Sequence, residues 1–203
     1  MDSPVFVAAM ALAALAGGAA GLRIEGLANV RAVRAVTDRP IIGLVKRAEP
    51  DSEIYITPRP EDVAALCAAG ADIVAFDATA RARPAPLVAL VAAAHAGGAL
   101  AMADLAAEAD AAPALAAGVD ILGTTLSGYT GGPEPEGPDL ALVAAFARLG
   151  RPVFAEGRYR TPEQAGAAIA AGATGVVVGS AITRIEHITG WFADAVRAAS
   201  GAT

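Results

Sequence analysis

The feature that most constrains the fold of this chain is a recurring junction where a helix ends at glycine and a short apolar run follows. Ala-Gly followed by small and then apolar residues occurs at Gly18, Gly70, Gly118 and Gly172, roughly 50 residues apart. Glycine closes helices because it adopts a left-handed backbone conformation without steric cost. A junction repeated at this interval predicts a chain of alternating helices and strands.

A second set of apolar runs lies between these junctions, so each period holds two strand–helix units. We expect seven strands, beginning near residues 20, 41, 72, 99, 119, 152 and 175. Continuous apolar strands that alternate with helices are typical of a parallel sheet covered on its faces. The even spacing favours a (β/α)8 TIM barrel over a doubly wound sheet, in one domain spanning residues 1–203. Because a predicted helix opens the chain, the strand lacking from the eight is the first.

Residues 3–22 carry no charged side chain and have the length of a membrane span or signal peptide. Three features argue against both. Asp2 precedes the run in place of basic residues, Ala and Gly dominate it, and it holds a helix start at Ser3–Pro4 and a stop at Gly17–Gly18. We therefore predict a buried helix of a soluble protein located in the cytoplasm.

The composition excludes several classes of protein. Hydrophobic residues make up 55% and charged residues 18%, which excludes disorder. The net charge is −6 and the basic residues form no run, so we expect no nucleic-acid or membrane partner. One cysteine and two distant histidines exclude a disulfide framework and a His/Cys metal site. We therefore expect no metal, and because no G-x-G-x-x-G follows a strand we expect no redox cofactor either.

Polar residues gather where the predicted strands end, and in TIM barrels the carboxyl ends of the strands carry the chemistry. They are Arg23, Glu25, Lys46, Arg47, Asp77, Thr79, Asp104, Thr124, Thr125, Glu156, Arg158, Gly179 and Ser180. Lys46 is the single lysine among 15 basic residues. Arginine stays protonated and cannot act as a base, so this lone lysine is the first candidate for proton transfer.

The last two predicted strands are followed by residues that suit a phosphate. Gly157 follows one strand, while Gly179 and Ser180 follow the other and open a short helix. Glycines let backbone N–H groups approach an anion, and a helix N-terminus adds its positive dipole end. Arg184 is placed to add a bidentate contact. We predict a phosphate site here.

Several blocks then occur in a recognisable order: Ile42–Arg47 with Asp51–Thr57, Asp77–Pro84, Met102–Asp104, Gly123–Thr130, Ala155–Tyr159 with Thr161–Glu163, and Gly179–Arg184. Together they resemble the N-acylmannosamine-6-phosphate 2-epimerases, the NanE family, from Ser3 to about Phe192. The chain departs from the family pattern in lacking a first strand of the kind GLIVSCQ. It also has Ala48 and Glu49 where an Asp-Tyr pair is common, and it lacks a second Tyr-Thr after Tyr129–Thr130.

The resemblance implies interconversion of N-acetylmannosamine 6-phosphate and N-acetylglucosamine 6-phosphate by proton removal and return at C2, in sialic acid and amino sugar breakdown. It implies that Lys46 is the catalytic acid/base and Glu156 its partner, in a one-base or a two-residue scheme. The other implied contacts are Arg23, Asp104 and Arg184 to the substrate, and Gly157, Gly179 and Ser180 near the phosphate. It also suggests a homodimer, with Trp191–Phe192 at the interface or packed on the barrel.

Two alternatives stay open at this point. One is a different phosphate-binding TIM-barrel enzyme, such as another sugar-phosphate isomerase or epimerase. The other is an inactive product of a shortened reading frame, because an open barrel leaves unpaired strand edges.

Overall fold

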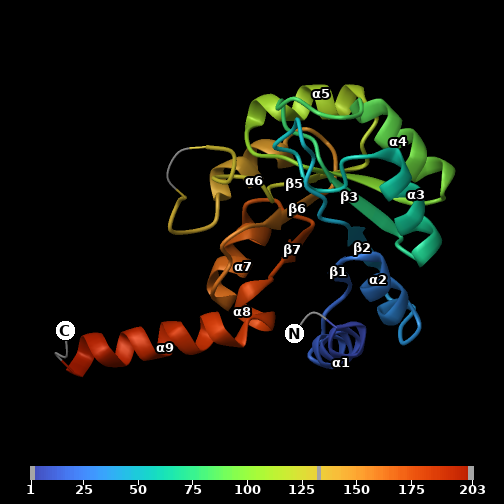
Figure 1. Ribbon diagram of the computed structural model, residues 1–203. Helices are drawn as coiled ribbons and strands as arrows, with labels where there is room; N and C mark the ends of the chain where they lie inside the picture. The colour runs from blue at the N-terminus through green and yellow to red at the C-terminus, as the bar shows by residue number, and fades with distance from the viewer. Residues whose placement is uncertain (1–2, 132–133, 201–203) are drawn as a thin grey trace.

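Seven parallel strands form one sheet in the computed structural model, which describes residues 3–131 and 134–200 (Figure 1). Each strand begins within two residues of its predicted position, and each pairs in parallel with the next along the chain. The strands are β1 Leu22–Glu25, β2 Ile41–Leu44, β3 Ile73–Asp77, β4 Leu100–Asp104, β5 Ile121–Gly123, β6 Val153–Glu156 and β7 Gly175–Val177.

Helices precede and separate the strands, as the repeated junction predicts. They are α1 Pro4–Ala16, α2 Leu27–Arg34, α3 Pro60–Ala69, α4 Leu87–Ala96, the 3-10 turn Glu108–Asp110, α5 Ala111–Ala116, α6 Leu140–Ala147, α7 Pro162–Ala170, α8 Ser180–Thr183 and α9 Ile185–Ser200. At the end of α3, Gly70 takes a φ of +101°, and a Cβ there would meet Arg34 Cγ at 2.7 Å. Gly70 is thus required for both backbone conformation and space, and Gly18, Gly118 and Gly172 share its positive φ.

The sheet is a nearly closed barrel with two edges. Within residues 3–131 and 134–200, β1 pairs with β2 alone, β7 pairs with β6 alone, and no strand joins them. Strand order follows chain order throughout, as in a (β/α)8 barrel. The prediction of a TIM barrel in which seven strands are present is therefore confirmed.

The strands separate two apolar cores because successive side chains point to opposite faces. One core fills the barrel interior with Ile42, Leu44, Ile73, Ala75, Met102, Ile121 and Leu126. The other lies between the strands and the helices that surround them, and includes Val30, Leu66, Val74, Phe76, Leu122 and Phe146. This alternation decides which polar side chains at the strand ends face the inside of the barrel.

The first helix confirms one prediction and corrects another. Ser3 caps α1 by accepting a hydrogen bond from the backbone N–H of Phe6, and Gly17 ends it, as predicted. The helix is not buried: Val5 is 79% exposed, and Ala11 is its one buried residue. Its neighbour in space is α2, beside the edge strand β1 (Figure 1), and its side chains Phe6 and Leu12 are exposed as well. Within the described residues, no helix combines the length and the apolar character needed to cross a bilayer.

A hydrogen bond from a backbone N–H to a polar side chain recurs at the amino-terminal end of the strands, with the period of the sequence repeat. Asp72, two residues after Gly70, accepts the backbone N–H of Ile41 at 2.8 Å. Asp120 accepts that of Ala101 at 2.8 Å, and the Thr174 hydroxyl accepts that of Val153 at 3.2 Å. In each case, a side chain that stands just before one strand accepts a backbone N–H group near the start of the preceding strand.

The last helix, α9, extends away from the sheet and has no buried residue (Figure 1). Phe192 is 72% and Val196 67% exposed. Trp191 stacks on the guanidinium of Arg160, with 5.5 Å from Cζ to the ring centroid. The helix thus presents large apolar side chains that the rest of this chain leaves uncovered.

We expect Gly43→Ala to lower the free energy of unfolding by roughly 1–3 kcal/mol, because overpacking a core costs that much. A Cβ at Gly43 in β2 would lie 2.8 Å from Ala71 Cβ and 3.2 Å from Leu66 Cδ2. Gly166→Ala in exposed α7 is the matched control, since a Cβ there meets nothing within 4 Å. We expect it to raise stability by about 0.4–1 kcal/mol in urea unfolding. Equal effects of the two changes would contradict the close packing assigned to Gly43.

Candidate active site

A buried arginine and two carboxylates form the centre of the site at the carboxyl ends of the strands. Arg23 Nη2 of β1 lies 2.6 Å from Asp104 Oδ2 of β4, and Arg23 Nε lies 3.0 Å from Glu156 Oε2 of β6. The Arg23 side chain is 7% exposed and that of Asp104 fully buried. Arg23 also contacts Met102 Sδ in the interior core at 3.7 Å. The ion pairs therefore cap that core and link three strands across the barrel.

The charge balance within this centre gives Glu156 an unusual protonation. Burial and the charge of Asp104 together raise the pKa of Glu156 to about 7, against the opposing positive charges of Arg23 and Lys46. Burial also acts to lower the pKa of Arg23, but its two carboxylate neighbours outweigh this, so that pKa lies above its ordinary value. Arg23 stays charged, while Glu156 exists in both protonation states near neutral pH. A carboxyl group poised in this way suits general acid–base catalysis.

Lys46 is held by a short hairpin that follows β2. Its backbone bridges that of Ile56, and flanking hydrogen bonds join Arg47 N–H to Tyr55 O and Thr57 N–H to Val45 O, each at 2.8 Å. Lys46 lies two residues beyond Leu44, so it continues the alternation that points Leu44 into the barrel. Its charge lowers the pKa of Glu156, so the two groups are within electrostatic reach. Its ammonium makes no ion pair with any residue of the described ranges.

Two ion pairs anchor this hairpin to the start of α3. Arg47 Nη2 lies 2.5 Å from Asp62 Oδ1, and Arg59 binds Glu49 through two contacts of 2.7 and 2.8 Å. Glu49 is one of the positions at which the chain departs from the family pattern, and its carboxylate here fixes the loop. Burial raises the pKa of Asp62, whose second oxygen has no hydrogen-bond partner in the described chain.

Two threonines at the end of β5 hold Glu156. The Thr124 hydroxyl donates to the backbone oxygen of Glu156 at 2.8 Å and accepts from its backbone N–H at 3.0 Å. The Thr125 hydroxyl donates to Asp104 Oδ1 at 2.7 Å and lies 3.3 Å from Glu156 Oε2. The sequence placed both threonines at a strand end but assigned neither a role. The missed signal is their position next to the β-strand that carries Glu156.

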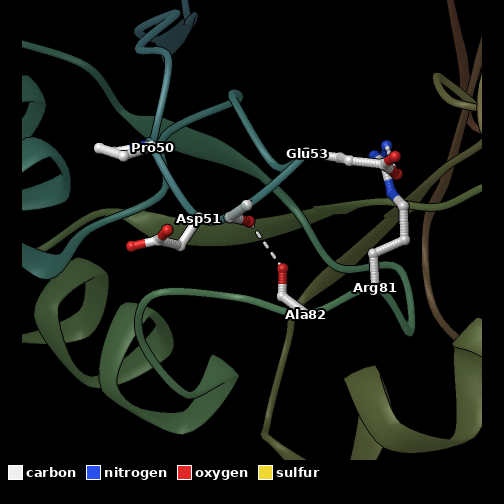
Figure 2. A pocket seen from close by; sticks show the side chains of 6 residues that line it. Pro50, Asp51, Glu53, Arg81 and Ala82 are labelled. Atoms are coloured by element: carbon white, nitrogen blue, oxygen red, sulfur yellow. Dashed lines mark hydrogen bonds and ion pairs between the residues drawn. The ribbon is translucent and has the colours of Figure 1, made fainter.

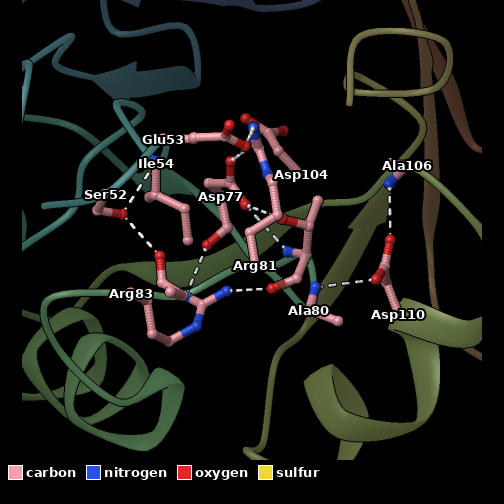
Figure 3. Close-up of polar contacts among 12 residues, drawn as sticks. Ser52, Glu53, Ile54, Asp77, Ala80, Arg81, Arg83, Asp104, Ala106 and Asp110 are labelled. Carbon is pink, nitrogen blue, oxygen red and sulfur yellow. Dashed lines mark hydrogen bonds and ion pairs between the residues drawn. The ribbon is translucent and has the colours of Figure 1, made fainter. Parts of the chain in front are cut away.

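Asp77, which ends β3 in register with Asp104, organises the neighbouring loop (Figure 3). It accepts hydrogen bonds from the Thr79 hydroxyl at 2.8 Å and from Arg81 Nη2 at 2.5 Å. Arg83 donates to its backbone oxygen at 3.1 Å. All these partners come from the segment that follows β3, so Asp77 fixes the loop rather than leaving a free carboxylate at the site.

An open hollow of about 450 Å³ lies between this loop and the Lys46 hairpin (Figure 2). It is lined by Pro50, Asp51, Ser52, Glu53, Arg81 and Ala82. The Ser52 hydroxyl donates to Ala82 O at 2.6 Å and ties the two loops together. None of the predicted site residues lines this hollow, so it is separate from the Arg23 centre.

Of the predicted phosphate residues, Gly157 adjoins this centre, and Gly179 and Ser180 lie outside it. Gly157 follows Glu156 directly, with a φ of +106°. Gly179 and Ser180 are exposed at the start of α8, and Arg184 is exposed and pairs with Glu186. Within the described residues, no hydrogen bond or ion pair joins Arg184 to Arg23, Asp104 or Glu156. The structure therefore brings Arg23, Asp104 and Glu156 together, with Lys46 in electrostatic reach of Glu156, and leaves Gly179, Ser180 and Arg184 exposed outside this cluster.

The described residues offer no group of three or more His, Cys, Asp or Glu side chains that could hold a metal ion. His95, near the end of α4, lies 2.8 Å from Asp120 Oδ2. The same Asp120 oxygen accepts the N–H that begins the β4 ladder. His95 thus belongs to the amino-terminal end of the barrel, opposite the Arg23 centre.

Comparison with known proteins identifies the family. A family model described as a putative N-acetylmannosamine-6-phosphate epimerase, NanE, matches residues 7–198. The chain belongs to the NanE family. A putative N-acetylmannosamine-6-phosphate 2-epimerase of Yersinia pseudotuberculosis serotype O:1b (strain IP 31758) is 60% identical over 197 residues, which are 97% of this chain and 84% of that protein. The corresponding protein of Yersinia pestis (strain Pestoides F) is 59% identical over the same shares.

A solved NanE-family structure shares the fold closely. The N-acetylmannosamine-6-phosphate 2-epimerase from Clostridium perfringens superposes with a TM-score of 0.92 at 41% identity, covering 95% of this chain and 86% of that chain. More distant structures, such as one described as QR15, an aldolase, with a TM-score of 0.68 at 16% identity, share the fold alone. The family resemblance predicted from the sequence blocks is confirmed.

We expect Glu156 to cost this NanE-family chain stability as the pH rises from about 5 to about 8. Its pKa of about 7 in the folded chain exceeds the ordinary 4.5, so the folded state keeps a proton that the unfolded chain releases. The free energy of unfolding then falls with rising pH, by on the order of 1–3 kcal/mol. Glu156→Gln removes this contribution, which urea unfolding at both pH values would measure.

The exposed Glu108→Gln serves as the control and should keep the pH dependence of the wild type. Parallel stability curves for the wild type and Glu156→Gln would contradict the raised pKa of Glu156.

Proposed function

We propose that this chain is an epimerase that interconverts N-acetylmannosamine 6-phosphate and N-acetylglucosamine 6-phosphate by removing and returning the proton at C2. The observation that carries the proposal is the interior cluster of Arg23, Asp104 and Glu156 with Lys46 in electrostatic reach. Membership of the NanE family supports this choice of substrate. Nothing in the site favours a different sugar phosphate.

The chemistry requires an acidic C2 proton and a stabilised anion. C2 is acidic only beside a carbonyl, so the sugar ring must open to the C1 aldehyde before or during proton removal. The resulting enolate carries negative charge, and fixed positive groups stabilise such charge best where water is excluded. Arg23 supplies buried positive charge beside Glu156, and the exposed Lys46 adds a second positive charge within electrostatic reach.

We assign Lys46 as the principal base and Glu156 as the group that orients it or shuttles a hydroxyl proton. In a one-base scheme, Lys46 removes the proton from one face and returns it to the other after the intermediate rotates. In a two-residue scheme, Glu156 serves the second face. Its pKa of about 7 supports either duty, because the carboxyl group can both take and give a proton at neutral pH.

The remaining predicted residues are proposed to bind the two ends of the substrate. Arg23 and Asp104 would contact the sugar, where their charges are already fixed by mutual pairing. The phosphate would lie at the edge of the barrel against Gly157, Gly179, Ser180 and Arg184. Its binding energy would hold C2 against Lys46 and so lower the barrier to proton removal.

The proposal is tested by proton NMR of the protein with N-acetylmannosamine 6-phosphate in heavy water. We expect deuterium at C2 together with appearance of the gluco epimer. Lys46→Arg keeps the positive charge but cannot act as a base, so we expect exchange at C2 to slow by at least about 100-fold. The exposed Arg148→Ala at the end of α6 should leave the rate unchanged.

Several outcomes would count against parts of this assignment. Exchange at another carbon, or isomerisation of a different sugar phosphate, would favour another enzyme of the barrel class. Full epimerase activity of Glu156→Gln would remove Glu156 from proton transfer. Equal rates for the wild type and Lys46→Arg would remove Lys46 as the base.

The proposal includes location in the cytoplasm. It also includes no nucleic-acid partner, since the 15 basic residues form no run. It also includes a homodimer in which α9 contacts a second copy of the chain. The support is the exposed apolar side chains of Ile185, Phe192 and Val196 on a helix with no buried residue. Uncovered apolar surface of this kind is typical of an interaction face.

We expect Phe192→Asp to shift the protein from dimer to monomer, because a buried unpaired charge opposes association. Sedimentation equilibrium of the wild type and the variant measures this directly. Val88→Asp on α4 is the matched control, since Val88 is exposed but stands on another helix. A monomeric wild type, or a dimer that survives Phe192→Asp, would contradict the role given to α9.

A further inference from the structure

The Thr125 hydroxyl lies between the two carboxylates of the site, at unequal distances from them. Its oxygen is 2.7 Å from Asp104 Oδ1 but 3.3 Å from Glu156 Oε2. A hydroxyl carries one hydrogen and therefore donates to one acceptor at a time. The shorter distance is typical of an O–H group that donates to a carboxylate, and the longer one exceeds the usual range. Thr125 thus donates to Asp104 and leaves an acceptor lone pair for Glu156.

The two carboxylates consequently differ in how well their charge is stabilised. Asp104 accepts hydrogen bonds at both oxygens, from Arg23 at Oδ2 and from Thr125 at Oδ1, and it is fully buried. Glu156 shares the same guanidinium through Nε at one oxygen, and its side chain is 21% exposed. One guanidinium pairs directly with both carboxylates, and Lys46 acts on Glu156 only from a distance, so the pair holds a proton more readily than either group alone.

We propose that Thr125 is a positioning residue that decides which carboxylate carries this proton: its hydroxyl keeps Asp104 ionised and leaves Glu156 to gain and lose a proton. When Glu156 is protonated, its O–H can donate to the Thr125 oxygen, whose own hydrogen already points to Asp104. Thr124 supports the arrangement through two hydrogen bonds of 2.8 and 3.0 Å between its hydroxyl and the backbone of Glu156. This inference rests on the proposed function for its link to catalysis.

The test uses Thr125→Val, which keeps the shape but removes the hydroxyl, and Thr125→Ser, which keeps the hydroxyl. Carbon-13 NMR of protein labelled at the glutamate carboxyl carbons follows the titration of Glu156, assigned by the signal lost in Glu156→Gln. We expect the Glu156 midpoint in Thr125→Val to fall by about one pH unit, because protonated Glu156 loses its acceptor and Asp104, no longer stabilised in its ionised form, takes up more of the shared proton. Thr125→Ser should return the midpoint to the wild-type value.

The pH profile of kcat/KM for epimerisation supplies a second readout. We expect the limb that follows Glu156 to move in the same direction and by the same amount in Thr125→Val, and to be restored in Thr125→Ser. A residue that serves only packing would lower the rate in Thr125→Val without moving either midpoint. An unmoved Glu156 midpoint, or a serine variant that behaves like the valine variant, would overturn the proposal.

The NMR titration needs no substrate, so the two proposals fail in distinguishable ways. If the midpoint moves as expected but neither the wild type nor any variant exchanges the C2 proton, the control of Glu156 by Thr125 holds and the epimerase assignment fails. If C2 exchange occurs but the midpoint stays fixed, the epimerase stands and the role of Thr125 fails. Circular dichroism of each variant shows that the fold is intact.

Discussion

The structure depends on one guanidinium inside the barrel. Arg23 pairs with Asp104 and Glu156, which come from strands on other parts of the sheet, and it rests on the interior apolar core. Without that positive charge, two buried carboxylates would face each other at considerable energetic cost. With it, both carboxylates are paired, and burial still raises the pKa of Glu156 to about 7. The same contact therefore fixes strand positions and sets the chemistry of the site.

The rest of the site divides between rigid strands and fastened loops. Arg23, Asp104 and Glu156 project from strands, whereas Lys46 stands on a hairpin that is fixed by Arg47–Asp62 and Arg59–Glu49. Asp77 likewise fixes the loop after β3 by pairing with Arg81. The acidic and basic groups outside the centre thus neutralise each other locally. This leaves the charge of Lys46 to act on Glu156.

The sequence predicted the strands and the polar residues at their carboxyl ends. The position of Arg23, Asp104 and Glu156 at strand ends, together with the family resemblance, singled these residues out, and the lone lysine stands out in an arginine-rich chain. Two features escaped prediction for physical reasons. The exposure of α1 depends on which neighbours cover it, and apolar content cannot reveal that. The role of Thr125 depends on a difference of a few tenths of an ångström between two contacts, which only coordinates express.

The side-chain hydrogen bonds at the amino-terminal end of the strands join different parts of the barrel from those joined by the ion pairs at the other end. Asp72, Asp120 and Thr174 each bind the start of the preceding strand, and so join β2 to β3, β4 to β5 and β6 to β7. Backbone hydrogen bonds join the remaining neighbours at the same end, from Leu22 to Pro40, from Leu100 to Asp72 and from Leu122 to Pro152, so every adjacent pair of strands is tied there. At the other end, Arg23 bridges β1, β4 and β6, which are not neighbours in the sheet. One end of the barrel is therefore held by contacts between adjacent strands, and the other also by contacts across its interior.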